Sequence, residues 1–239
     1  DNYKQLFADP TFQLVFKNTI EFTLACLVVQ FTIGFLFAMF FSKKFTLAGP
    51  IRGLVLVGYM MPMSVTALLG KNLFLLDGGV INDLLMKVHL ISSPIDWLVN
   101  GGTALGAVIA VNCWVGIPFN MLLLTSGLTG ISTDIYESAS MDGANAFKRF
   151  IYITLPLMKP AMLSVLMLGF IYTFKAFDLM YIMTAGGPFN STDVLGTYAY
   201  SKAFTQYEFS QGSAIAMVLF ACLFLVGIFY LKLLSKEDD

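Results

Sequence analysis

The sequence predicts an all-α protein of the polytopic membrane class, a bundle of transmembrane helices. Hydrophobic residues make up 57% of its 239 residues and charged residues only 12%. An ordinary soluble domain is roughly 45–50% apolar. Several apolar stretches also approach the roughly 20 residues that a helix needs to cross the hydrocarbon, where the backbone must satisfy its own hydrogen bonds.

Five stretches qualify as spans, and together they form one predicted transmembrane domain over residues 1–239. Pro62 and Gly70 interrupt the second span, whereas Gly116 and Pro118 lie inside the third. The predicted spans cover residues 19–41, 53–76, 104–124, 161–184 and 213–234.

Basic residues near the span ends predict the orientation, because cytoplasmic loops are enriched in Lys and Arg. Alternation of five spans places on one side Lys43, Lys44, Arg52, Lys148, Arg149, Lys159, Lys232 and Lys236. The opposite loops hold fewer basic residues over a greater length: Lys4, Lys17, Lys71, Lys87 and Lys202. The loop of residues 127–159 and the C-terminus are therefore predicted to be cytoplasmic. Asp1 falls outside, so we expect at least one further transmembrane helix upstream.

The composition argues against several classes of function. With a net charge of −1 and a single histidine, His89, the chain offers no basic surface for nucleic acid and no histidine cluster for a metal. Cys26, Cys113 and Cys222 lie far apart in apolar segments, which suits small hydrophobic residues better than a disulfide framework. No G-x-x-x-x-G-K-[ST] phosphate loop is present, so we expect no catalytic residues and no ATPase activity in this chain.

Two long connections are predicted on the extracytoplasmic side. Residues 77–103 are expected to form interfacial or re-entrant helices with Trp97 as an anchor. Residues 185–212 open with Gly186-Gly187-Pro188, where glycine permits positive φ and proline stops a helix.

The cytoplasmic loop is predicted to contain two helices. Thr133 or Asp134 can cap a helix that starts near Ile135 and has Glu137 in its first turn. A turn at residues 143–146 and a helix over 147–154, ending before Pro156, would follow. The small and charged residues of the loop suit close packing against another protein. The alternative is an interfacial helix pair that only joins two spans.

The loop reads E-S-A-x-x-D-G-A-x8-I-x-L-P and resembles the EAA loop of the membrane subunits of bacterial ATP-binding-cassette (ABC) importers. Three other segments are similar to the F-type subunit of maltose-type permeases: Asn18-Thr19, residues 112–119 (N-C-W-V-G-I-P-F) and residues 184–188 (T-A-G-G-P). The resemblance covers essentially the whole chain. The resemblance implies the type I ABC importer permease fold. It also implies ATPase-coupling roles for Glu137, Ser138, Ala139, Asp142, Gly143 and Ala144, although Ser138 stands where alanine is usual.

The same resemblance implies the partners and the location. We expect a second permease subunit, two ATPase subunits that carry ATP and Mg, and an extracytoplasmic solute-binding protein. The chain itself would bind no cofactor and would cross the bacterial plasma or inner membrane many times, in contact with lipid. The expected cargo is a sugar or a related solute.

Matching to maltose-type permeases suggests a set of solute-binding residues, although packing between helices is the alternative for each. They are Met63, Ala67, Asn112, Gly116, Phe119, Tyr172, Thr173 and Ala176. Ala176 stands where the maltose permease has a polar amide, so the solute can differ. Trp114 and Tyr181 can serve as buried anchors.

Two alternatives for the function remain open. Lys175 and Asp178 are three residues apart and can meet on one helix face, where they would neutralise each other, contact solute or carry a coupling proton. The last role would make the chain a proton-coupled secondary transporter, but no pair of inverted, broken repeats supports that class. The nearer alternative is an importer for glycerol phosphate, a polyol or an unusual oligosaccharide.

Overall fold

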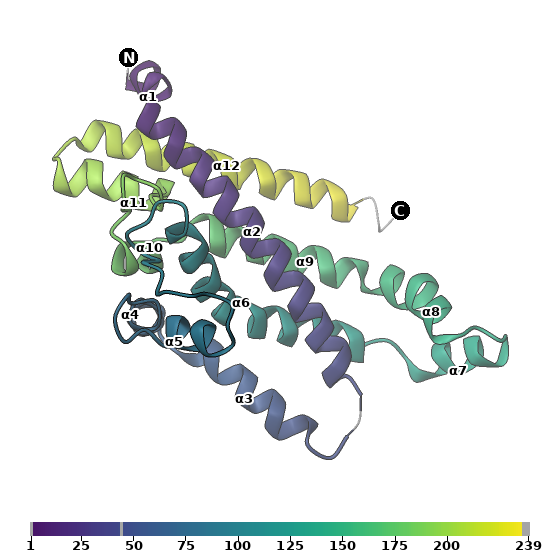
Figure 1. Cartoon of the computed structure of the whole chain (residues 1–239). Helices are drawn as coiled ribbons and strands as arrows, with labels where there is room; N and C mark the ends of the chain where they lie inside the picture. The colour runs from purple at the N-terminus through teal and green to yellow at the C-terminus, as the bar shows by residue number, and fades with distance from the viewer. Residues whose placement is uncertain (1, 44, 236–239) are drawn as a thin grey trace. The chain divides into compact units, whose positions relative to one another are not determined.

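The computed structural model describes residues 2–43 and 45–235, and helices are the only regular secondary structure in that part of the chain (Figure 1). The helices are α1 (Asn2–Ala8), α2 (Pro10–Phe41), α3 (Ala48–Met60), α4 (Met63–Leu73), α5 (Val80–Lys87), α6 (Ala104–Thr129), α7 (Thr133–Met141), α8 (Ala146–Arg149), the π-helical η1 (Phe150–Thr154), α9 (Leu155–Phe174), α10 (Asp178–Met183), α11 (Leu195–Tyr200), the π-helical η2 (Ser201–Thr205) and α12 (Phe209–Ser235). Lys44 and residues 236–239, which entered the prediction of orientation, lie outside the described residues.

Four helical segments are long and apolar enough to cross a membrane: Pro10–Phe41, Ala104–Thr129, Ala146–Phe174 and Phe209–Ser235. Helices α3 and α4 pass the same test only as a pair, so a fifth span exists only in broken form. The span predicted over residues 53–76 is thus interrupted near Pro62, as predicted. The break falls at Pro62, which lacks the N–H that a continuing helix needs.

Gly70 does not interrupt a helix as predicted but lies inside α4. A Cβ added there would come within 2.6 Å of Val111 Cγ2 on α6. Its role is close packing between helices, for which small residues are typical in membranes.

The first span begins earlier than the predicted residue 19. Asp9 and Pro10 start α2: the Asp9 carboxylate accepts a hydrogen bond from the Thr11 amide at 2.9 Å, and Pro10 occupies the first helical position. This is a favoured helix start. Helix α6 extends past residue 124 to Thr129, and α12 covers its predicted range with a few residues added at its start.

The fourth span differs most from the predicted residues 161–184. Helix α9 ends at Phe174, and the short α10 begins only at Asp178. At its start, α8, η1 and α9 follow one another without a break, so Pro156 does not end a helix as predicted. The carbonyl that the Pro156 ring would displace belongs to Tyr152 in the π-helical η1, whose altered hydrogen-bond pattern accommodates the proline.

The connection over residues 77–103 contains one helix, α5, and no further helix from 88 to 103, so the prediction of several interfacial helices is wrong. Asn82 holds this segment together. Its side chain accepts hydrogen bonds from the Trp97 indole at 2.9 Å and the Ile95 amide at 3.1 Å, and donates to the Ile95 carbonyl at 3.0 Å. Trp97 therefore anchors a loop to the buried Asn82.

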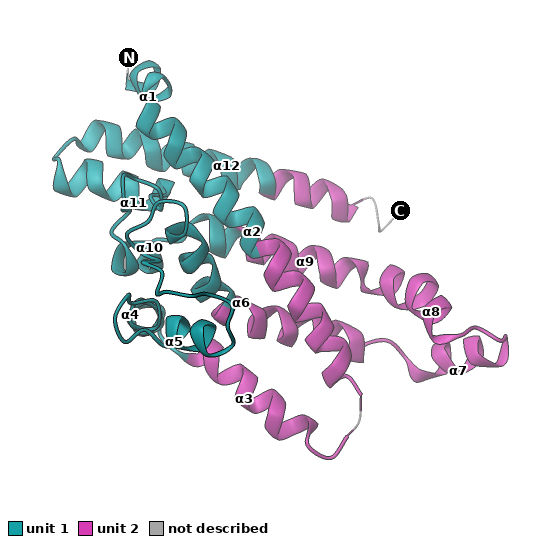
Figure 2. Cartoon of the chain, viewed as in Figure 1, with its two compact units in different colours: residues 1–26, 61–113, 171–226 teal, residues 27–60, 114–170, 227–239 magenta. Residues whose placement is uncertain are grey.

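The chain divides into two compact units (Figure 2). Unit 1 comprises residues 1–26, 61–113 and 171–226, and unit 2 comprises residues 27–60, 114–170 and 227–239. In unit 2, an apolar core joins α2, α6 and α9 through Phe35, Ala38, Leu124, Met158 and Val165. Unit 1 buries Cys26 and Cys113, and neither forms a disulfide within the described part of the chain.

Unit 1 also brings together Asn18-Thr19 and the loop that opens with T-A-G-G-P. Asn18 Nδ2 donates to the carbonyls of Asn190 and Asp193 at 2.8 and 3.2 Å. The hydroxyl of Thr19 accepts from the Leu195 amide at 3.0 Å. These bonds attach the N-terminal part of α2 to the segment that leads into α11.

Candidate coupling loop and solute-binding residues

The polar loop between α6 and α9 folds as a helical hairpin of α7 and α8 in unit 2 (Figure 1). Ser132 caps α7, since its hydroxyl accepts from the Asp134 amide at 3.3 Å. The predicted caps, Thr133 and Asp134, are instead the first two helical residues, so Glu137 lies beyond the first turn. The correction follows from the serine, which is as good a cap as either residue.

Gly143 ends α7 in the left-handed conformation, with φ of +77°. The Ala144 amide donates to the Ala139 carbonyl at 2.9 Å, and the Gly143 amide donates to the Ser140 carbonyl at 3.1 Å. This pair of bonds is the Schellman motif, which favours glycine at the left-handed position. Nothing lies within 4 Å of a Cβ built on Gly143, so the space beside its backbone is open.

Side chains hold the two helices of the hairpin together. The Asn145 side chain caps α8 by accepting from the Lys148 amide at 2.9 Å. Arg149 Nη1 donates to the Ser140 hydroxyl at 2.7 Å, and the hydroxyls of Tyr136 and Thr154 lie 3.0 Å apart. The predicted second helix over 147–154 is present as α8 and η1, which continue into α9.

The predicted coupling residues lie on the surface of this hairpin. Glu137, Ser138, Asp142 and Gly143 are exposed, whereas Ala139 and Ala144 are half-buried. Two large apolar side chains that the sequence analysis did not single out accompany them, because Met141 is 89% and Phe147 72% exposed. Their signal in the sequence was an apolar residue within an otherwise polar run. The hairpin thus presents both charge and apolar area to a partner.

The predicted solute residues divide between the two units. In unit 1, Ala67, Asn112 and Thr173 are buried, Met63 and Ala176 are half-buried and Tyr172 is 56% exposed. Ala176 lies in the break between α9 and α10, so it is not on the helix that carries Tyr172 and Thr173.

In unit 2, Gly116 and Phe119 are half-buried, and each packs against a neighbour. The Gln30 amide of α2 occupies the space that a Cβ on Gly116 would need, and the Gly116 carbonyl accepts from Asn120 Nδ2 at 2.8 Å. The Phe119 ring stacks on Tyr59, with 5.5 Å between centroids. Gln30 is itself buried, with 3% exposed, and was not predicted as a site residue.

Lys175 and Asp178 do not form the predicted pair. Lys175 lies in the break before α10 and Asp178 is the first residue of that helix, so the two never share a helix face. Instead, Lys175 Nζ lies 5.3 Å from the centre of the Tyr172 ring, within the range of a cation–π interaction. Among the described residues, no ion pair joins Lys175 to Asp178.

Unit 1 also contains an aromatic cluster of Phe177, Tyr181 and Tyr200, in which Tyr181 is 45% exposed and so is not the buried anchor that was predicted. Their ring centroids lie 5.2–5.3 Å apart. Phe177 and Tyr200 line a cavity of about 490 Å³ together with small residues of α11 and α12. The cluster begins directly after Ala176, one of the predicted solute residues. No grouping of His, Cys, Asp and Glu within residues 2–43 and 45–235 could hold a metal.

The sequence pattern of the family described as binding-protein-dependent transport system inner membrane components matches residues 30–236. The chain belongs to this family. It is a permease subunit of an ABC importer, as the EAA-like loop predicted. The proton-coupled secondary transporter, the alternative from another class, is not favoured.

Curated relatives of this permease include carbohydrate transport proteins. The chain is 32% identical over 238 residues to the sulfoquinovosyl glycerol transport system permease of Agrobacterium fabrum, covering 100% of this chain and 77% of that protein. It is 30% identical over 231 residues to the trehalose/maltose transport system permease of Thermococcus litoralis, covering 97% of this chain and 77% of that protein.

Solved structures show the permease fold directly. A bacterial ABC transporter for alginate import superposes with a TM-score of 0.89 at 19% identity, over 100% of this chain and 84% of that chain. The methionine ABC transporter matches with a TM-score of 0.68 at 13% identity, over 96% and 98% of the respective chains. At these identities the likeness concerns the fold, which is the type I fold predicted from the sequence.

Proposed function

We propose that this permease is the non-catalytic membrane subunit of an importer for sugars or carbohydrate-containing solutes. The transporter would contain two ATPase subunits that carry ATP and Mg, one of which would dock on the cytoplasmic loop of this chain. A second permease subunit would complete the pathway, and an extracytoplasmic binding protein would deliver the solute. The C-terminus would be cytoplasmic, as the basic residues predict.

The surface of the α7–α8 hairpin is the observation that carries the coupling role. Met141 and Phe147 expose apolar area on the same hairpin as the exposed Glu137 and Asp142, a combination that a solvated loop does not need. A docking surface does, because a buried apolar anchor with a polar rim is the usual anatomy of an interface. The hydrogen bonds from Arg149 and Tyr136 would keep this surface rigid as force passes to α9.

The aromatic cluster of unit 1 supports a carbohydrate as cargo. The C–H faces of a sugar pack on aromatic rings, while its hydroxyls form directed hydrogen bonds with groups such as the Tyr181 and Tyr200 hydroxyls. The relatives named for trehalose/maltose and sulfoquinovosyl glycerol carry related chemistry. We infer that solute contacts include Tyr172 and this cluster, and that buried Ala67, Asn112 and Thr173 shape the wall behind them.

Coupling is tested in the assembled transporter reconstituted with its binding protein. Met141→Asp should abolish the stimulation of ATP hydrolysis by solute-loaded binding protein, whereas Met141→Leu should retain it because the apolar contact persists. Assembly of the two permease subunits should not change, since Met141 lies outside the membrane spans. Wild-type stimulation in Met141→Asp would refute docking through this hairpin.

The cargo is tested by uptake of a panel containing maltose, trehalose, a longer glucan and glycerol 3-phosphate. We expect ATP-dependent uptake of a saccharide that is insensitive to an uncoupler. Tyr200→Ala should raise the KM for that solute, and Tyr200→Phe should change it little. Uptake of glycerol 3-phosphate alone would favour the alternative importer, and an unchanged KM in Tyr200→Ala would return the cluster to a packing role.

A further inference from the structure

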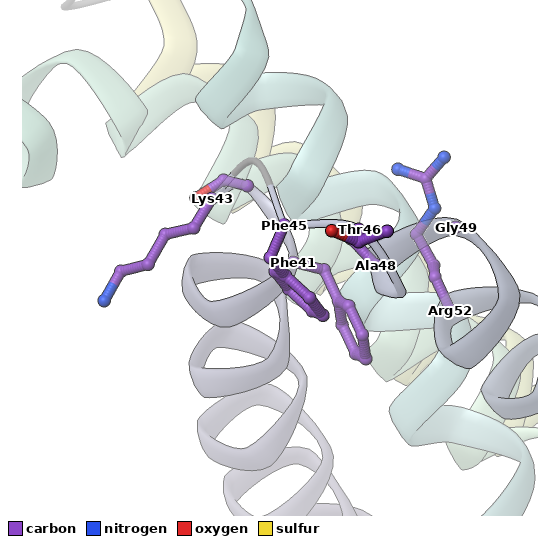
Figure 3. A pocket seen from close by; sticks show the side chains of 8 residues that line it. Phe41, Lys43, Phe45, Thr46, Ala48, Gly49 and Arg52 are labelled. Atoms are coloured by element: carbon purple, nitrogen blue, oxygen red, sulfur yellow. The ribbon is translucent and has the colours of Figure 1, made fainter.

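The turn between α2 and α3 contains a cavity of about 550 Å³ within unit 2, here called the α2–α3 pocket (Figure 3). Its lining includes two aromatic rings, Phe41 and Phe45, and two hydroxyls, Ser42 and Thr46. Lys43 and Arg52 complete it with positive charge. None of these residues belongs to the coupling hairpin or to the predicted solute site.

The charge of the α2–α3 pocket is positive and locally uncompensated. Lys43 and Arg52 are exposed, and among the described residues neither has an ion-pair partner. The sequence contains no Asp or Glu between Glu21 and Asp77, so no neighbouring carboxylate along the chain neutralises them. In Figure 3 their side chains extend on either side of the Phe41 and Phe45 rings. Two uncompensated cations on the rim of one pocket favour an anionic ligand, such as a phosphate ester.

The surroundings of the pocket are apolar, which points to the source of that anion. The rings of Phe41 and Phe45 lie nearly parallel, 6.4 Å apart, and Phe40 packs against both. Phe40 on α2 is 52%, Leu47 in the turn 60% and Leu54 on α3 74% exposed. A free phosphate would use none of this apolar area, whereas the acyl chains of a lipid would cover it.

The depth of the pocket agrees with a lipid. It lies where α2, a helix long enough to cross the membrane, ends at Phe41 and where α3, half of the broken span, begins at Ala48. Aromatic and basic side chains at span ends lie at the level of the lipid head groups. We propose that the α2–α3 pocket binds the phosphate of an anionic phospholipid, with Lys43 and Arg52 contacting its oxygens and the acyl chains following Phe40, Leu47 and Leu54.

The first test counts lipids on the complete transporter, purified with its partner subunits, by native mass spectrometry during titration with phosphatidylglycerol or phosphatidylcholine. A basic side chain near an anionic surface is worth about fivefold in affinity, so Lys43→Gln/Arg52→Gln should weaken one phosphatidylglycerol site by roughly 25-fold. Lys43→Arg/Arg52→Lys is the matched control and should retain it. Equal retention in the Gln and the charge-conserving variants would overturn the proposal.

A second pair of variants changes Gly49 and leaves the charges of Lys43 and Arg52 in place. Gly49 lines the pocket and nothing lies within 4 Å of a Cβ built on it, so a side chain fits there. Gly49→Asp should reduce phosphatidylglycerol binding, and Gly49→Asn, which has the same size without the charge, should not. Equal loss in both variants would contradict an electrostatic site.

Competition distinguishes the two sources of phosphate. Inorganic phosphate or glycerol 3-phosphate at millimolar concentration should not displace phosphatidylglycerol from the wild-type transporter, because neither brings an acyl chain. Displacement by either would show a site for free anions and overturn the lipid assignment. Equal binding of phosphatidylcholine would overturn it as well. None of these outcomes depends on the proposed solute.

Discussion

At the scale of single residues, two glycines of this permease are required for different structural reasons. Gly143 is needed for its positive φ at the end of α7. Gly116 is needed because the Gln30 amide fills the space next to it. The resemblance to maltose-type permeases assigns the first to ATPase coupling and the second to solute binding, but each has a local structural reason as well. Substitutions at each glycine can separate its structural role from its functional role.

At Gly143 we predict different outcomes for valine and asparagine. A β-branched residue in the left-handed region costs about 1–2 kcal/mol, so Gly143→Val should fray the end of α7 and abolish stimulation of the ATPase. Asparagine tolerates that conformation, so Gly143→Asn should preserve the turn, seen as unchanged amide exchange over residues 139–144. If a partner packs against the bare backbone, this variant should lose stimulation too. Full stimulation in Gly143→Asn would restrict the glycine to forming the turn.

At Gly116 we predict that the cost of a methyl group depends on Gln30. Gly116→Ala should lower the thermal stability of the transporter, because overpacking typically costs about 1–3 kcal/mol. Adding Gln30→Ala should restore stability by removing the clash. Uptake decides the role: recovery of uptake in the double variant would assign Gly116 to packing, whereas continued loss with restored stability would support a solute contact.

At the scale of elements, the positions of helix breaks follow from where backbone groups find partners. Pro62 separates α3 from α4, yet Pro118 and Pro160 lie inside α6 and α9. Pro160 removes the helical hydrogen bond to the carbonyl of residue 156, and the Ser164 hydroxyl donates to the Pro160 carbonyl at 2.9 Å one turn later. Sequence alone shows the prolines but not these partners.

The loop that joins α10 to α11 contains a buried carboxylate whose titration can be tested. Burial raises the pKa of Asp193, against the lowering effect of a hydrogen bond donated by the Thr197 hydroxyl. The folded chain therefore holds the proton more tightly than the unfolded chain. The stabilisation that tighter proton binding gives the folded chain is complete below the ordinary pKa of aspartate, and it is lost as pH rises through the raised pKa.

Asp193→Asn should therefore increase thermal stability at pH 8 and alter it less at pH 5. Asparagine keeps an oxygen that can accept from Thr197 while removing the buried charge. Thermal unfolding of the purified transporter at the two pH values measures the effect, with exposed Asp77→Asn as control. Equal shifts at both pH values would contradict the assignment.

For the whole molecule, the remaining prediction concerns orientation. The described basic residues Lys43, Arg52, Lys148 and Lys232 predict that the turn after α2, the α7–α8 hairpin and the end of α12 lie on one side of the membrane. The loop that contains Asn190 would then be outside. Both the coupling role and the lipid proposal assume this orientation, so it can be tested independently of either.

Cysteine labelling in intact cells provides that test. In a chain whose own three cysteines are replaced by alanine, a cysteine at Asn190 should react with an impermeant thiol reagent, and one at Asn145 should react only after permeabilisation. Both positions are exposed, so accessibility does not limit the reaction. Labelling with the opposite pattern would reverse the topology.

The sequence by itself determined the class, the family and the hairpin. Apolar composition and span length predicted a helical membrane protein, and the fold of the alginate importer agrees. The loop carried the family resemblance through residue types at fixed spacing, and the turn at Gly143 could be predicted from its neighbours, whereas the cap of α7 proved to be Ser132. Such features depend on local chemistry, so a sequence displays them directly.

Tertiary structure decided which residues meet. Asn18 binds the carbonyls of Asn190 and Asp193, Gln30 packs on Gly116, and Lys175 turns to Tyr172 instead of Asp178. The predicted helix face beyond Phe174 failed because the helix ends there, and helix periodicity assumes continuity. Contacts between distant segments arise only when helices pack together, since a buried amide or ring takes its partner from whichever helix lies beside it.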